Sequence, residues 1–204
     1  MTPKQIWRFF EALGDELERP ATAIVTGAAA GALMGHIRPS LDVDFEIAPD
    51  TKGAVAWQAA EAAIGRATTA AGIQSNFAEN IDRWGQITLL DYRQTAQKYR
   101  RYGNLTVRLM EPTYWAIGKL TRYLAPDVED LVGVLKQQHV LSGPAIKLWA
   151  KALRASPRSA ACIQFRQHVE HFIRTYGREV WGKSFNPDAG IKEFQRRAFG
   201  PPVR

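Results

Sequence analysis

Two acidic residues, Asp42 and Asp44, alternate with the apolar residues Val43 and Phe45. Successive side chains of a strand point to opposite faces, so this alternation predicts a strand with both carboxylates on one face. Two adjacent carboxylates repel each other unless a cation neutralises them. Their oxygens suit Mg²⁺, which commonly binds one or two carboxylates and completes its shell with phosphate oxygens and water. The spacing therefore predicts a magnesium site at Asp42 and Asp44.

The segment before this strand could position a phosphate beside the metal. Ile24 and Val25 form an apolar run typical of a strand, and Gly27 follows, with small residues after it that suit a close-packed helix. A helix beginning at Gly27 would present free backbone N–H groups and the positive end of its dipole, which both attract phosphate. We therefore expect the backbone at the turn of Gly27 to bind phosphate.

These residues resemble the signature of the DNA polymerase beta-like nucleotidyltransferases. That signature is a glycine followed by Gly or Ser, a spacer, and then Asp-hydrophobic-Asp/Glu-hydrophobic, which Gly27 and residues 42–45 match. Residues 35–44, GHIRPSLDVD, are closer still to the small bacterial nucleotidyltransferase-like proteins related to the AbiEii abortive-infection toxins. The chain departs from the signature at Ala28, where the family usually has Gly or Ser, and this departure weakens the expected phosphate contact.

A second stretch resembles the same group. The family pattern is a strand that ends before a proline, then a helix that contains Lys-Leu-x-Arg, then Asp-x-x-Asp-Leu. In this chain the matching segments are, in the same order, NLTVRLMEP at 104–112, GKLTR at 118–122 and PDVEDL at 126–131. The two motifs occur in the expected order and together span residues 22–135.

The resemblance implies Mg²⁺-dependent transfer of a nucleotide from an NTP. In such a reaction Asp42 and Asp44 would hold the metal, and Lys119 would balance phosphate charge as a point cation. Asp130 matches a family position that is often needed for activity, and it would orient Lys119. Ser40 would contact phosphate or, by analogy with related toxins, be a site of self-modification.

Two further residues complete the predicted site. Arg38 is expected to contact the nucleotide. A third carboxylate is usual in active members of the family, and Asp91, at the end of a predicted strand, is the candidate for it.

Several of these residues also have a structural explanation. The Asp42–Asp44 pair could be a solvated strand edge, and Arg38 could simply form an ion pair with it. Lys119 could belong to an ordinary exposed helix face, and Asp130 could stabilise a helix dipole from the first turn.

Other residues that could bind metal or stack on bases have simpler explanations. His168 and His171 lie one turn apart without a third ligand at suitable spacing, so we interpret them as a surface or half-buried pair. Cys162 is interpreted as packing in an apolar helix, and the tryptophans at 57, 84, 115, 149 and 181 are interpreted as core residues.

The charge is distributed unevenly along the 204 residues. The net charge is +7, but residues 1–135 hold 14 Lys/Arg and 16 Asp/Glu, whereas residues 136–204 hold 13 and 4. The resemblance implies a nucleotidyltransferase-like domain at 1–135. The change in charge predicts a basic helical region at 136–204, which could bind a polyanion or be merely a well-solvated surface. With one cysteine, no secretory leader and no apolar run of membrane length, we expect a cytoplasmic protein without a membrane partner.

The spacing of apolar residues predicts an α+β fold. The resemblance implies a core of the α/β nucleotidyltransferase type, with a short mixed β-sheet flanked by helices, and the apolar spacing after it predicts a C-terminal helical bundle. Besides the core motif, the pattern predicts helices at 3–18, 51–71 and 112–124, strands at 73–77, 86–90 and 105–110, and a helix or exposed loop at 92–101.

Two functions of different classes follow from these patterns. The first is a nucleotidyltransferase that modifies an RNA, with tRNA as one candidate, or a protein, and that could be the toxin of a toxin–antitoxin pair with a cognate antitoxin as partner. The second is an inactive protein of the same fold that binds a nucleotide or a partner, which Ala28 and the uncertain third carboxylate leave open.

Overall fold

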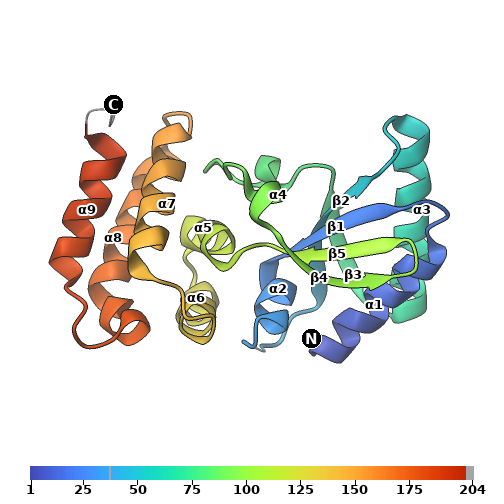
Figure 1. The fold of residues 1–204 in the computed structure, drawn as a ribbon, viewed down its shortest axis with the longest axis horizontal. Helices are drawn as coiled ribbons and strands as arrows, with labels where there is room; N and C mark the ends of the chain where they lie inside the picture. The colour runs from blue at the N-terminus through green and yellow to red at the C-terminus, as the bar shows by residue number, and fades with distance from the viewer. Residues whose placement is uncertain (37, 201–204) are drawn as a thin grey trace. The chain divides into compact units, whose positions relative to one another are not determined.

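A computed structural model describes residues 1–36 and 38–200. The chain forms two compact units, one of residues 1–81 and 93–111, the other of residues 82–92 and 112 onward. The first unit contains a five-stranded mixed sheet with helices, and the second is helical (Figure 1), which confirms the α+β class. The main break, between residues 111 and 112, lies upstream of the change in charge at residue 135.

The first unit alternates helices and strands around one sheet. The strands have the spatial order β3-β2-β1-β5-β4, in which β1 pairs antiparallel with β2 and parallel with β5, β2 pairs parallel with β3, and β4 pairs antiparallel with β5. The elements are α1 (Pro3–Glu16), β1 (Ala21–Thr26), α2 (Gly27–Leu33), β2 (Asp42–Pro49), α3 (Ala54–Ala71), β3 (Gln74–Ala78), β4 (Gln97–Tyr102) and β5 (Leu105–Leu109).

Helix α1 covers the apolar face of β2. The helix begins at a capping box in which Thr2 and Gln5 each satisfy a backbone N–H of the other. Its buried Phe9 and Phe10 each lie 5.7 Å, between ring centroids, from Phe45 of β2. Because side chains alternate along a strand, the residues on either side of Phe45 face away from α1.

The second unit is built from five long helices within its described residues. Large aromatic side chains fill its core, and the indole N–H of Trp149 donates a hydrogen bond to the carbonyl of Thr113 at 3.0 Å. The long helices are α5 (Pro112–Arg122), α6 (Ala125–Gln137), α7 (Ser142–Ala155), α8 (Ala160–Trp181) and α9 (Pro187–Phe199). The helices expected after the sheet are thereby confirmed.

The predicted strand at 86–90 is wrong. Its backbone N–H groups bind side chains instead of a neighbouring strand: that of Thr88 donates to Ser156 Oγ at 2.9 Å, and that of Leu89 donates to Asp82 Oδ1 at 2.5 Å. A short 3₁₀-helix, η1 (Ile81–Trp84), precedes this segment.

The region 92–101 also differs from its prediction. It contains a single helical turn, α4 (Tyr92–Thr95), followed by most of the edge strand β4. No helix in the described residues is both long enough and apolar enough to span a membrane.

Candidate metal centre

Asp42 and Asp44 lie at the beginning of β2, on the face opposite Phe45. Both are partly exposed, whereas the alternate residues Val43 and Phe45 are completely buried. The apolar positions anchor the strand against the core and thereby fix the direction in which the two carboxylates point.

Asn76 of the neighbouring strand brings the two carboxylates together. In the β2–β3 register Asn76 lies opposite Asp44. Its side-chain Nδ2 donates to Asp42 Oδ2 at 2.8 Å and to Asp44 Oδ1 at 3.0 Å. Ser40 Oγ lies 3.1 Å from the other oxygen of Asp42 and donates to it. The two aspartates therefore converge on the amide nitrogen of Asn76, while Ser40 contacts Asp42 alone.

Gly27 fits closely against Asp44. Its φ is +62°, in the left-handed region, and a Cβ placed on it would lie 1.9 Å from Asp44 Oδ2. Only glycine allows both this backbone conformation and this approach. Gly27 begins α2, a helix of seven residues, and Ala28 behind it is buried. The predicted contacts of these two residues with phosphate stay a prediction.

A third acidic residue of β2, Glu46, shares the face of the two aspartates. It is almost completely buried, and Arg93 binds both of its oxygens, with Nε 2.5 Å from Oε1 and Nη2 3.0 Å from Oε2. The backbone N–H of Ile81 also donates to Oε2, at 3.1 Å. Glu46 is not among the predicted site residues, although the same alternation that groups the aspartates includes it. Its charge is neutralised internally, so it serves as a structural anchor.

Arg38 and Asp91 have contacts that do not test their predicted roles. Arg38 Nη1 donates to the carbonyl of Pro39 at 3.1 Å. Asp91 belongs to the other unit, has a φ of +57°, and lies 3.9 Å from the ammonium of Lys151. Among residues 1–36 and 38–200, no three His, Cys, Asp or Glu side chains are grouped so that they could hold a metal.

Lys119 lies in a second charged cluster, in the helical unit. Its ammonium is 2.6 Å from Asp130 Oδ2 and 3.1 Å from Asp127 Oδ1, and it faces the ring of Trp115 at 5.4 Å. The Lys119 side chain is only 3% exposed, and both aspartates are equally buried. This arrangement favours a structural role, because a phosphate could reach the ammonium only if the cluster opened.

Arg122 completes this buried cluster from one side. Its Nη2 is 2.6 Å from Asp127 Oδ1 and its Nε is 3.2 Å from Oδ2. Burial alone would raise the pKa of Asp127, but the hydrogen bonds from Arg122 and the charge of Lys119 outweigh burial and lower this pKa from its ordinary value. The carboxylate is therefore held in its charged form.

The two histidines of α8 contact a tyrosine. Tyr123 stacks on His168 with ring centroids 4.7 Å apart, and its hydroxyl lies 2.8 Å from His171 Nδ1. His168 Nδ1 is 2.8 Å from the carbonyl of Leu120, so this nitrogen carries a proton and donates it. Burial raises the pKa of the Tyr123 phenol, which keeps the hydroxyl neutral.

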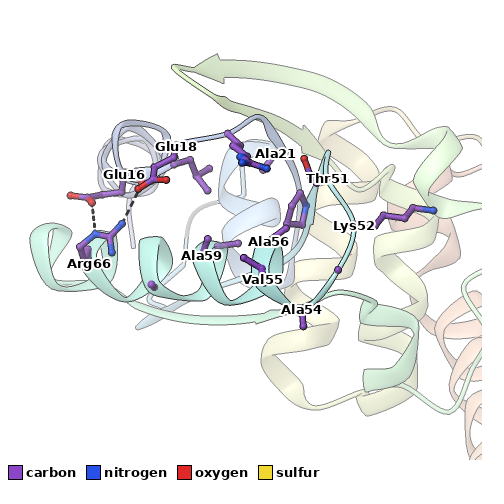
Figure 2. A pocket seen from close by; sticks show the side chains of 16 residues that line it. Glu16, Glu18, Ala21, Thr51, Lys52, Ala54, Val55, Ala56, Ala59 and Arg66 are labelled. Atoms are coloured by element: carbon purple, nitrogen blue, oxygen red, sulfur yellow. Dashed lines mark hydrogen bonds and ion pairs between the residues drawn. The ribbon is translucent and has the colours of Figure 1, made fainter.

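A hollow of about 470 Å³ lies at the opposite end of β1 and β2. Its lining includes the paired residues Ala21 and Pro49, whereas Asp44 pairs with Thr26 at the other end of the same two strands. Figure 2 shows Glu16 and Arg66, joined by a 2.5 Å ion pair, beside the small side chains of α3. The hollow is thus separate from the acidic pair.

Comparisons of the chain with known proteins identify no relative. No family model matches the chain, no curated protein matches it, and no solved structure matches its fold.

Proposed function

We propose that this protein is a Mg²⁺-dependent nucleotidyltransferase that transfers a nucleotide from an NTP to an RNA or protein acceptor. The observation that carries the proposal is the convergence of Asp42 and Asp44 on a single amide nitrogen, beside a glycine whose position allows close approach to Asp44. The resemblance of residues 22–135 to nucleotidyltransferases gives this geometry its chemical interpretation.

The residues around the aspartates fit a hard divalent cation. Asp42 and Asp44 offer carboxylate oxygens, and Ser40 and Asn76 add neutral oxygen-bearing groups within hydrogen-bonding distance. Magnesium prefers such oxygens and leaves part of its shell to water and substrate phosphates. A soft or borderline metal would select thiolate or imidazole ligands instead.

In the proposed reaction an acceptor hydroxyl oxygen attacks the α-phosphorus of the NTP. A bond forms between that oxygen and phosphorus, the bond from phosphorus to the bridging oxygen breaks, pyrophosphate leaves, and the hydroxyl proton is released to solvent. A bound Mg²⁺ would neutralise charge on the phosphates. Asp42 and Asp44 would hold that metal, and Gly27 leaves the room that the Asp44 carboxylate itself occupies.

The charged cluster of the helical unit supports the fold in this proposal. Asp130 contacts the Lys119 ammonium, and the cluster braces α5 against α6. The excess of Lys and Arg after residue 135 favours RNA as acceptor, because phosphate backbones attract basic surfaces. A toxin acting on tRNA and restrained by a cognate antitoxin is one form of this proposal.

The test is transfer of label from each of the four α-labelled NTPs, with Mg²⁺, to total cellular RNA and protein. We expect label in one fraction with the unaltered chain, and a loss of about 100-fold or more with Asp42→Ala or Asp44→Ala. Asp50→Ala is the matched control, because Asp50 is an exposed aspartate just after the same strand. Equal transfer by Asp42→Ala and Asp50→Ala would refute the assignment of Asp42 to the reaction.

A second function, nucleotide or partner binding without catalysis, is favoured by one observation. The side chain that joins the two aspartates is the amide of Asn76 instead of a third carboxylate. If calorimetry detects Mg²⁺ and NTP binding while no fraction is labelled, this second function replaces the first.

A further inference from the structure

We propose that Asn76 is a third ligand of the divalent cation and that, in the metal-free protein, the same side chain holds the two aspartates together. This inference rests on the proposed metal site at Asp42 and Asp44. It adds to that site a residue from a neighbouring strand. The amide would hold the two carboxylates together in the metal-free protein and would supply an oxygen ligand when the cation is bound.

The first step is the position of Asn76 in the sheet. Parallel pairing places it directly opposite Asp44 on β2, and paired residues project from the same face. Asp42 and Asp44 also share that face, so three oxygen-bearing side chains from two adjacent strands meet at one place. The hydrogen-bonded sheet backbone fixes this meeting, because a shift of one residue would turn Asn76 to the other face.

The second step concerns the two ends of the amide. Its nitrogen now faces Asp42 Oδ2 at 2.8 Å and Asp44 Oδ1 at 3.0 Å, and donating two hydrogen bonds offsets part of the repulsion between the carboxylates. An amide also carries an oxygen that donates nothing and accepts freely. A half-turn of the side-chain amide replaces the N–H groups with this oxygen, which is a ligand for a hard cation.

Solvent and ions can reach Asn76 and the two aspartates. Asn76 is exposed and the two aspartates are partly exposed, so the amide has room to turn and a hydrated cation can approach. Gln74 lies on the same face of β3 and is exposed too, yet in the described residues it makes no hydrogen bond with either carboxylate. The structure thus contains a matched amide that shares the strand and face of Asn76 but lacks its contacts.

The test measures Mn²⁺ binding by the loss of the free-ion electron paramagnetic resonance signal, with Mg²⁺ as competitor. Asn76→Ala removes both the donor and the ligand oxygen, and we expect it to raise the Mn²⁺ Kd about 10-fold or more. Asn76→Asp removes the donor but supplies an anionic oxygen, and we expect it to bind Mn²⁺ at least as tightly as the unaltered chain. Gln74→Ala should leave the Kd unchanged, and circular dichroism should show that all three variants fold.

The outcomes separate this inference from the proposed function. If Asp42→Ala abolishes Mn²⁺ binding while Asn76→Ala leaves the Kd unchanged, the metal site stands and the role of Asn76 is refuted. If Asn76→Asp weakens binding as much as Asn76→Ala, the amide acts as a donor only and the ligand role is refuted. If the unaltered chain binds no Mn²⁺, the metal site and this inference both fail.

Discussion

Two pairs of aspartates in this protein have similar spacing in sequence but different surroundings. Asp42 and Asp44 are partly exposed, and the contacts described above for them come from the neutral groups of Ser40 and Asn76. Asp127 and Asp130 are buried against the ammonium of Lys119, and Arg122 binds Asp127 as well.

The difference shows that the spacing of acidic residues does not by itself identify a catalytic site. A buried carboxylate requires a counter-charge within the protein, and the charge of the second pair is already used for that purpose. The first pair is partly exposed and accepts hydrogen bonds from the neutral groups of Ser40 and Asn76, so it is the pair to which the proposed function assigns a cation. Substitutions in and around each pair test this distinction.

The largest expected effect is on stability, from removing the ammonium of the buried cluster. Lys119→Met leaves Asp130 buried without its ammonium partner and takes one of two cations from Asp127. Breaking a buried pair from one side costs about 3–5 kcal/mol of unfolding free energy. Urea unfolding should show this loss, whereas Lys136→Met, at an exposed lysine of α6, should change the value by less than about 0.5 kcal/mol.

The opposite result for Lys119 would revise the comparison. If Lys119→Met unfolds like the unaltered chain but binds NTP much more weakly, the ammonium is available to phosphate and the cluster opens in solution. The phosphate-binding role predicted from the resemblance would then replace the structural one.

The next effect concerns the backbone that supports Asp44. Gly27→Ala places a Cβ 1.9 Å from Asp44 Oδ2 and also strains a backbone with φ of +62°. The backbone strain alone should lower the free energy of unfolding by about 1–2 kcal/mol, and displacement of the Asp44 side chain should lower it further. Gly72→Ala is the control, because Gly72 has φ of +67° and nothing within 4 Å of its added Cβ. Both variants should lose stability in urea, but only Gly27→Ala should also weaken Mn²⁺ binding.

Most of the fold could be predicted because apolar spacing reports directly on buried faces. The helix predicted at 3–18 is α1, the helix at 51–71 is α3 ending at Gly72, and the strand at 105–110 is β5. Strand β4 was not predicted because its sequence, QKYRRY, carries polar residues on both faces and so shows no apolar alternation. Charged side chains are common on edge strands, and β4 lies at the edge of the sheet. The apolar residues at 86–90 suggested a strand, and Ile87 is indeed buried. However, backbone N–H groups of this segment donate to side chains instead of to a neighbouring strand.

The candidate site could be predicted only where neighbouring residues define it. Asp42 and Asp44 share a face because of local alternation, so the sequence alone groups them. Asn76 joins them through the register of two strands separated by a helix, and no local pattern encodes that register. Likewise, Lys119 looks exposed by its residue type, and only its packing between α5 and α6 shows that it is buried.

A smaller effect is expected from pH. The pKa of Asp127 is lowered in the folded protein. The charged carboxylate therefore stabilises the fold fully at pH values above its ordinary pKa of 3.8. This stabilisation is lost as the pH falls from 3.8 through the lower pKa of the folded state. Urea unfolding between pH 2 and pH 7 should therefore show stability falling in acid. Asp127→Asn should flatten this part of the profile, and an unchanged profile would show that the carboxylate is not preferentially charged in the fold.

The smallest expected effect is the change in stability of the metal-free protein when one accessible carboxylate is neutralised. Asp42→Asn keeps the size of the side chain and removes one of two like charges, so the loss of a favourable hydrogen bond and the relief of repulsion oppose each other. In the presence of a chelator the unfolding free energy should stay within about 1 kcal/mol of the unaltered value. Added Mg²⁺ at ten times its Kd should then stabilise the unaltered chain by about 1.4 kcal/mol and leave Asp42→Asn almost unchanged, because only a folded state that binds the ion gains from it. A large loss in chelator would mean that Asp42 supports the fold as the buried aspartates do, and the distinction between the two pairs would have to be abandoned.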